Sequence, residues 1–149
     1  MPTYEGDNTV MANQTINYLI KKLKKIKSGK PAIGFMRYLN NIDVLLLKQS
    51  TALTVDKFME LQHLDDALAI RAAYLINDVT SKLNNSKADK KTTLNDLYAQ
   101  EIFNMAKSHM LYMSFAIYRE VIETTEFSDS RVKPLLQLIA RIFALKQLM

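Results

Sequence analysis

Few side chains in this sequence of 149 residues are suited to chemistry. The absence of Cys excludes disulfides, thiolate metal sites and Cys nucleophiles. The two histidines, His63 and His109, have no carboxylates at metal-type spacing on a shared face, so we predict no metal site. His109 falls in the middle of an apolar helical stripe, which favours a hydrogen-bonded core histidine over an acid–base group.

One carboxylate stands in a more distinctive setting. Glu5 and Gly6 directly precede a long amphipathic pattern that is typical of a helix. A carboxylate there can act as a general base, and the glycine permits a close approach of the backbone to a ligand. N–H groups at the helix start could face a phosphate or a flavin. Taken by themselves, these residue types are explained better by structural roles than by a functional site. Glu5 would be stabilised by the helix dipole, Gly6 would make a turn and Asn8 would cap the helix.

The sequence of Tyr4–Val10, YEGDNTV, favours a functional site instead. Together with Gln14-Thr15 and Tyr18-Leu19 it resembles the segment that opens the C-terminal helical region of peroxisomal acyl-CoA oxidases. The resemblance implies that Glu5 is the base that removes the α-proton of the acyl-CoA, and that Gly6 and Asn8 lie close to FAD. It continues more loosely along most of the chain.

The resemblance also implies what the complete protein does. It would be an FAD-dependent, commonly homodimeric enzyme that converts fatty acyl-CoA to trans-2-enoyl-CoA with formation of hydrogen peroxide, in peroxisomal fatty-acid β-oxidation. Because such enzymes are several times longer, we expect this chain to be a piece of one and to be inactive in isolation. A fragment of an acyl-CoA dehydrogenase remains an alternative, as does a non-catalytic helical module for interaction or dimerisation.

The composition predicts an all-α protein. Hydrophobic residues make up 48% and charged residues 23%, with only three Gly and three Pro. We predict one domain over 1–149, an antiparallel bundle of about four long helices similar to the C-terminal region of acyl-CoA oxidases and dehydrogenases. Its parts are the motif and first helix in 1–29, a connector in 30–55 and the remaining helices in 56–149. No apolar run is long enough to span a bilayer.

Helical periodicity and capping residues place the elements. The first helix is expected over about 9–28, the second from 56 or 65 to 83, the third over 93–122, and the fourth after a turn at 124–129. The expected signals are Asp7 or Asn8 as the first cap, Gly29 as the first stop, a Thr93/Asp96 capping box, and a Ser128 or Ser130 cap. The fourth helix is apolar on nearly all sides, so we expect it to be buried, partly by surface beyond these helices.

The net charge of +5 is concentrated on the first helix. The cluster consists of Lys21, Lys22, Lys24, Lys25, Lys27 and Lys30. No aromatic residue is interleaved among these lysines and Arg is absent from them, which disfavours nucleic-acid binding. We therefore predict a solvated helix face and no nucleic-acid partner.

Overall fold

The computed structural model describes residues 3–49 and 54–149, apart from the side chains of 3–8 and Lys90, and its described residues contain helices and no strand. The elements are α1 (Thr3–Lys27), η1 (Gly34–Asn41), α2 (Ile42–Leu47), α3 (Val55–Phe58), α4 (Leu61–Asn85), α5 (Lys90–Thr92), η2 (Thr93–Leu97), α6 (Ala99–Thr124) and α7 (Val132–Leu148). The predicted all-α class is confirmed.

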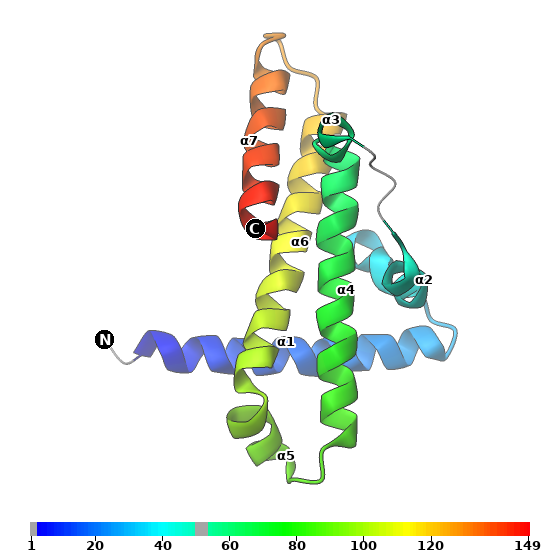
Figure 1. Cartoon of the computed structure of the whole chain (residues 1–149), viewed down its shortest axis with the longest axis vertical. Helices are drawn as coiled ribbons and strands as arrows, with labels where there is room; N and C mark the ends of the chain where they lie inside the picture. Colours follow the sequence, from blue (N-terminus) through cyan, green and yellow to red (C-terminus); the bar gives the residue numbers. More distant parts are fainter. Residues whose placement is uncertain (1–2, 50–53) are drawn as a thin grey trace.

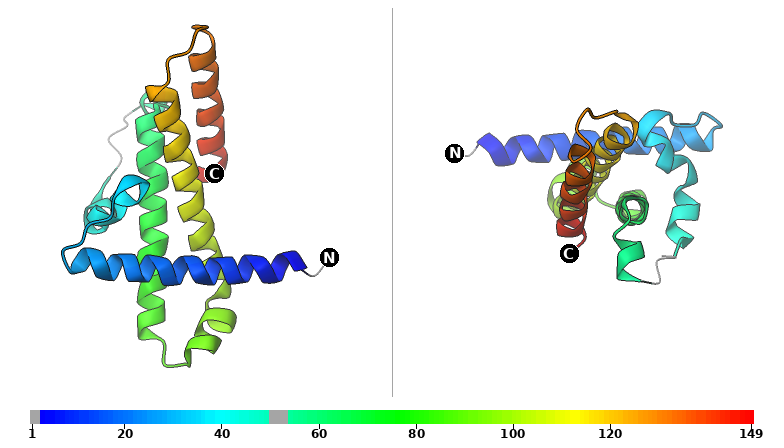
Figure 2. Two further views of the ribbon diagram at one scale, coloured as in Figure 1. Left: turned by 180° about the vertical axis from the view of Figure 1, so that it is seen from behind. Right: turned by 90° about the horizontal axis from the view of Figure 1, so that it is seen from above.

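The antiparallel pair α4 and α6 forms the centre of the molecule (Figure 1). α7 returns beside the upper part of this pair, and α1 lies across its lower part instead of joining the bundle in parallel (Figures 1 and 2). The short elements η1 and α2 lie at the side of α4. The predicted four long helices are therefore present, but only three of them run antiparallel.

Two apolar cores follow from this arrangement. The upper core joins α4, α6 and α7 through Leu61, Leu64, Leu68, Ala69, Ala72, Tyr112, Phe115, Ile122, Ala140 and Ala144. The lower core joins α1, η1, α4 and α6 through Ala12, Ile16, Leu19, Leu39, Ile76, Val79, Ile102, Met105 and Ala106. Each large aliphatic side chain buried in them contributes about 1.5–3 kcal/mol.

Both ends of α1 bear on the sequence predictions. The helix begins at Thr3 instead of residue 9, so Asp7 and Asn8 lie inside it and the prediction that they cap it is wrong. At the other end Gly29 adopts φ 82°, as predicted. The backbone amide of Lys30 donates to the carbonyl of Lys25 at 2.9 Å, and the backbone amide of Gly29 donates to the carbonyl of Ile26 at 3.0 Å. These two bonds close the last turn of α1.

The connector is more ordered than predicted. Its first half forms η1 and α2, and η1 places Leu39 fully inside the lower core. The side-chain amide of Asn40 pairs with both backbone groups of Ala32, at 2.8 Å to the amide and 2.9 Å to the carbonyl. These two bonds close the segment between residues 32 and 40 on itself. Residues 50–53 of the predicted connector lie outside the described residues.

The region before α6 differs from the predicted long third helix. The residues Thr93–Leu97 form a single π-helical turn, and α6 begins only at Ala99. Thr93 makes no capping box with Asp96, because its buried hydroxyl donates instead to the carbonyl of Asp89 at 2.8 Å. A π-turn of this kind is often found at a functional site.

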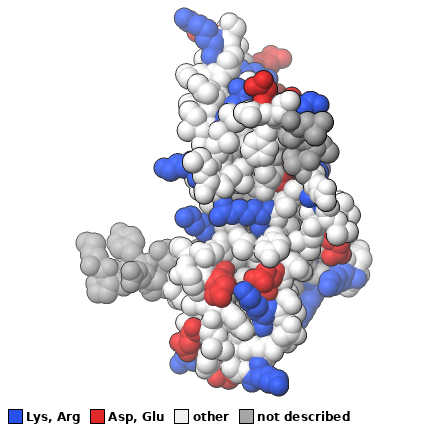
Figure 3. Space-filling view, viewed as in Figure 1, with Lys and Arg blue, Asp and Glu red and all other residues white. Residues whose placement is uncertain are grey.

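α6 and α7 are less enclosed than their apolar sequences predict. On α6, the apolar side chains of Phe103, Met110 and Ile117 are 39%, 57% and 42% exposed, so its apolar pattern is wider than the face that it buries. α7 buries only two residues, Ala140 and Ala144. Its exposed apolar side chains are Leu135, Leu138, Ile139 and Ile142. Figure 3 shows few charged side chains over α7 on this face of the molecule.

The start of α7 also differs in detail. Neither Ser128 nor Ser130 caps it. The N-cap position is Arg131, which makes no side-chain cap bond, and in the turn before it the carboxylate of Asp129 accepts a bond from the backbone amide of Arg131 at 2.9 Å. Pro134 falls in the first turn, where its missing N–H leaves no bond unmade.

Candidate functional site

The predicted site residues Glu5, Gly6 and Asn8 lie in the first two turns of α1. Glu5 and Asn8 are three positions apart and therefore share one side of the helix. Gly6 lies inside the helix and therefore makes no turn there, and it adds no side chain to the first turns of α1. The side chains of this segment lie outside the described part of the structure.

The next turns of α1 fix the position of this segment. Ile16 and Leu19 are fully buried in the lower core, and the amide of Asn13 donates to the side-chain oxygen of Asn95 at 2.9 Å. Val10 and Met11, nearest the motif, are 54% and 61% exposed. The N-terminal end of α1 extends beyond the α4–α6 pair (Figure 2). The core thus holds the middle of α1 and leaves its motif end projecting from the bundle.

A second group of polar side chains lies where η1 meets α6. The hydroxyl of Tyr38 is 2.6 Å from Nδ1 of His109, and the ring centroid of Tyr38 is 4.5 Å from that of Tyr112. Burial lowers the pKa of His109 to about 4, which keeps the imidazole neutral at pH 7. Burial also raises the pKa of Tyr38 above its ordinary value and that of Tyr112 to about 12. The predicted hydrogen-bonded core histidine is confirmed.

The buried carboxylate of Asp65 lies beside this group. Desolvation raises the pKa of Asp65 to about 6. The positive charge of Arg119, whose Nη1 is 3.4 Å from Oδ2 of Asp65, lowers the pKa but does not offset the effect of burial. The other oxygen, Oδ1, has no hydrogen-bond partner. A cavity of about 310 Å³ is lined by both residues, by Tyr38 and Tyr112, and by Arg37. Sequence reasoning missed this cluster because its residues come from η1, α4 and α6 and share no spacing.

Two kinds of feature are absent from the described ranges, a metal-binding cluster and a membrane-spanning helix. There, no three His, Cys, Asp or Glu side chains come together as a set that could hold a metal ion. No described helix has the length and hydropathy needed to cross a bilayer.

The chain matches known proteins over most of its length. The family described as Acyl-CoA oxidase matches residues 60–149. The chain is similar to peroxisomal acyl-coenzyme A oxidase 1 of Rattus norvegicus, at 25% identity over 96% of this chain and 22% of the relative. It is also similar to an acyl-coenzyme A oxidase of Debaryomyces hansenii, at 22% identity over 97% of this chain and 19% of the relative.

The fold has a solved counterpart. The crystal structure of an acyl-CoA oxidase from tomato, Lycopersicon esculentum, superposes with a TM-score of 0.87 at 22% identity, covering 98% of this chain and 22% of the other. The arrangement in which α1 lies across α4 and α6 is thus shared. The chain spans about a fifth of the length of the relatives that it matches.

Proposed function

Because the chain belongs to the acyl-CoA oxidase family, we propose that it forms part of an enzyme that oxidises fatty acyl-CoA. The products are trans-2-enoyl-CoA and, from O₂, hydrogen peroxide, and the pathway is fatty-acid β-oxidation. The observation that carries the proposal is the family match over residues 60–149, preceded in the same chain by the motif on α1. The relatives named as peroxisomal support the peroxisome as the location.

In this proposal Glu5 is the general base. Its carboxylate accepts the α-proton of the acyl-CoA, which requires a distance of about 2.6–3.2 Å or one bridging water. A bound FAD would supply the acceptor for the hydride that leaves the β-carbon. Gly6 and Asn8 lie near the FAD, Gly6 because it adds no side chain to the first turn of α1. Two features favour this use of α1: its motif end projects from the bundle, and Val10 and Met11 beside it are exposed and free to pack on another part of the enzyme.

The isolated chain, a single helical domain over 1–149, is expected to be inactive. A base needs surrounding groups that hold both it and the substrate in place. The chain covers only 22% of the rat relative, so most of such a shell would come from elsewhere in the protein. Purified 1–149 should carry no stoichiometric flavin and turn over no acyl-CoA, which absorbance and a peroxide assay would measure.

The role of Glu5 can be tested in a chimera. This chain would replace the matching segment of the tomato acyl-CoA oxidase, which has the same fold. Flavin content would report assembly, and hydrogen peroxide formation without an added electron carrier would distinguish an oxidase from a dehydrogenase. We expect Glu5→Gln to keep the flavin and to lower peroxide formation by a factor of about 10² or more.

A matched control is Glu101→Gln, which makes the same change on α6, where Glu101 lies 3.9 Å from Lys82. It should leave peroxide formation within about twofold, since exposed ion pairs contribute little. If Glu5→Gln retained full activity in the flavin-loaded chimera, Glu5 would not be the base.

A second candidate function is a helical module for dimerisation. It is favoured by the apolar side chains of α7 that remain exposed, with Leu135 and Ile142 each 58% exposed. Paired in a homodimer, such a surface would be removed from water. Sedimentation of the isolated chain would show a concentration-dependent dimer, and Leu135→Gln with Ile142→Gln would abolish it. A monomer at all concentrations would count against this function.

A further inference from the structure

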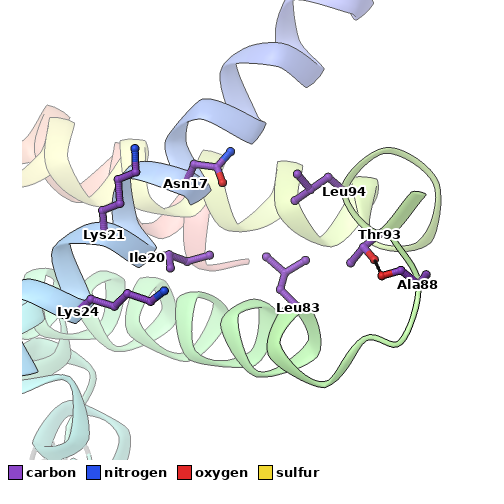
Figure 4. A pocket seen from close by; sticks show the side chains of 8 residues that line it. All are labelled: Asn17, Ile20, Lys21, Lys24, Leu83, Ala88, Thr93 and Leu94. Carbon is purple, nitrogen blue, oxygen red and sulfur yellow. Dashed lines mark hydrogen bonds between the residues drawn. The ribbon is translucent and has the colours of Figure 1, made fainter. Parts of the chain in front are cut away.

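A hollow of about 390 Å³ opens where α1 passes the end of α4 (Figure 4). Its lining comes from three separate parts of the chain: Asn17, Ile20, Lys21, Lys24, Leu83, Ala88, Thr93 and Leu94. We call it the basic hollow. Its volume is within the range of about 300–1,000 Å³ that is usual for small-molecule sites. It is separate from the motif end of α1 and from the Tyr38–His109 cluster.

The floor of the basic hollow is apolar. Ile20, Leu83 and Leu94 pack with their inner sides on the lower core and remain only half-buried. Figure 4 shows Ile20 and Leu83 pointing toward each other from α1 and α4. These three side chains leave part of their hydrocarbon surface open to the hollow. A ligand with an apolar portion would gain about 25 cal/mol for each Å² of that surface removed from water.

The rim of the basic hollow is positively charged. Lys21 and Lys24 are exposed, and neither takes part in the ion pairs found among the described side chains. Lys87 and Lys91 flank the lining residue Ala88 along the chain. Asp89, the nearest carboxylate in sequence, keeps its negative charge, and its Oδ1 accepts bonds from the backbone amides of Lys91 and Thr92 at 3.0 and 3.1 Å. Among the described side chains it forms no ion pair with Lys21 or Lys24, whose ammonium groups are thus available to a ligand.

The far wall of the basic hollow is held in place by hydrogen bonds. The buried hydroxyl of Thr93 is 2.9 Å from that of Ser86 and bonds to the carbonyls of Ala88 and Asp89, so the 86–93 turn is closed on itself. The Asn13–Asn95 bond ties the π-helical turn to α1. The walls are thus positioned without a ligand, which reduces the entropy that binding would cost.

We propose that the basic hollow binds a free, single-chain anionic amphiphile. Its hydrocarbon part lies on Ile20, Leu83 and Leu94, and its anionic head group is held by the ammonium groups of Lys21 and Lys24. The floor alone would accept any apolar group, and the rim alone any anion. Their juxtaposition selects a molecule that has both. The site needs neither flavin nor turnover, so it stands independently of the function proposed above.

The test uses the full chain of 149 residues and three probes in isothermal titration calorimetry. Dodecanoate below its micellar concentration has both parts of the proposed ligand, dodecanol has only the tail, and acetate only the head group. The charge variant is Lys21→Gln with Lys24→Gln. Its matched control is Lys25→Gln with Lys27→Gln, which removes two charges from the same helix outside the lining. Ala88→Trp fills the exposed side of the hollow and leaves its charge unchanged.

We expect saturable binding of dodecanoate at one site, weakened about three- to tenfold in the charge variant and within twofold of wild type in its control. Ala88→Trp should abolish it. The proposal is overturned if dodecanoate does not bind, if dodecanol or acetate binds equally well, or if both lysine pairs weaken binding alike. Binding to anionic phospholipid vesicles but not to free dodecanoate would also overturn it, because the ligand would then be a membrane surface.

Discussion

The hydroxyl of Tyr38 in η1 lies 2.6 Å from Nδ1 of His109 in the middle of α6, a contact between residues 71 positions apart. It joins the connector to the central helix pair at the boundary between the two cores, since Tyr38 packs on both. The tautomer of His109 decides which group donates. A protonated His109 has no acceptor, so its charged form would lose this bond unless the phenol turned its oxygen lone pairs to it.

The first prediction concerns the pH dependence that His109 confers. Its pKa is about 4 in the folded chain against 6.5 in the unfolded chain. As the pH falls below 6.5, the unfolded state binds a proton at His109 before the folded state does, which favours unfolding. The stability that the neutral His109 contributes above pH 6.5 is therefore lost as the pH falls toward 4. Denaturant titrations at pH 6.5 and 5 should differ by up to about 2 kcal/mol from this group alone.

The control for this effect is His109→Gln, which cannot titrate. The variant should lose the His109 part of the difference between pH 6.5 and 5, even if it is less stable throughout. An unchanged difference would mean that folding does not shift the pKa of His109.

The second prediction concerns Asp65, whose effect has the opposite sign. Its pKa is raised from 3.8 to about 6, so the folded state binds the proton more tightly than the unfolded state does. Its stabilising contribution is therefore fully present below pH 3.8 and is lost as pH rises through about 6. Asp65→Asn should remove this loss. The free energy of unfolding at pH 7 minus that at pH 5 should therefore be larger in the variant than in the wild type, by about 1 kcal/mol or more.

Asp66→Asn is the matched control, since Asp66 is its neighbour on α4 and is 2.7 Å from Lys48 at the surface. This variant should change the pH dependence less than Asp65→Asn does, because the charge of Asp66 is a smaller cause of the raised pKa of Asp65 than burial is. Equal effects of the two substitutions would show that burial of Asp65 is not the cause.

The third prediction separates the two sides of α6. Phe115 is 1% exposed in the upper core, whereas Phe103 on the same helix is 39% exposed. Phe115→Ala should cost about 3–5 kcal/mol, because it removes a buried ring and leaves a cavity. Phe103→Ala should cost about 1 kcal/mol or less. Urea unfolding of both variants would measure the contrast, and similar losses would show that Phe103 is buried in solution.

The long helices could be predicted because their signals are local. The stripe from Leu61 to Val79 repeats at helical spacing and is buried in α4 as expected. The capping predictions at Asn8 and Thr93 failed because several residues near each boundary have the same capping chemistry, and tertiary contacts decide among them. The Thr93 hydroxyl, for example, is used by the 86–93 turn.

The polar clusters could not be predicted for a different reason. Asp65 and Arg119 meet only because α4 and α6 run antiparallel at one register, which no spacing along the chain reveals. Glu5 was expected just before the first helix and lies inside α1 instead, while its role as a base stays a prediction. On α7, Leu138 and Ile142 face outward because one side of the helix packs on α4 and α6, and the expected burial of the other side by further surface stays a prediction.

The last prediction concerns the end of α1. Gly29 adopts φ 82°, a conformation that L-residues with a side chain rarely adopt, and a Cβ there would meet no atom within 4 Å. Any cost of Gly29→Ala is therefore one of backbone conformation alone, and we expect about 1 kcal/mol in urea unfolding. Gly29→Asn should cost less, because Asn tolerates the left-handed region better than Ala does. A stabilising Gly29→Ala would mean that α1 continues through residue 29 in solution, and the turn that brings η1 back to His109 would then have to form elsewhere.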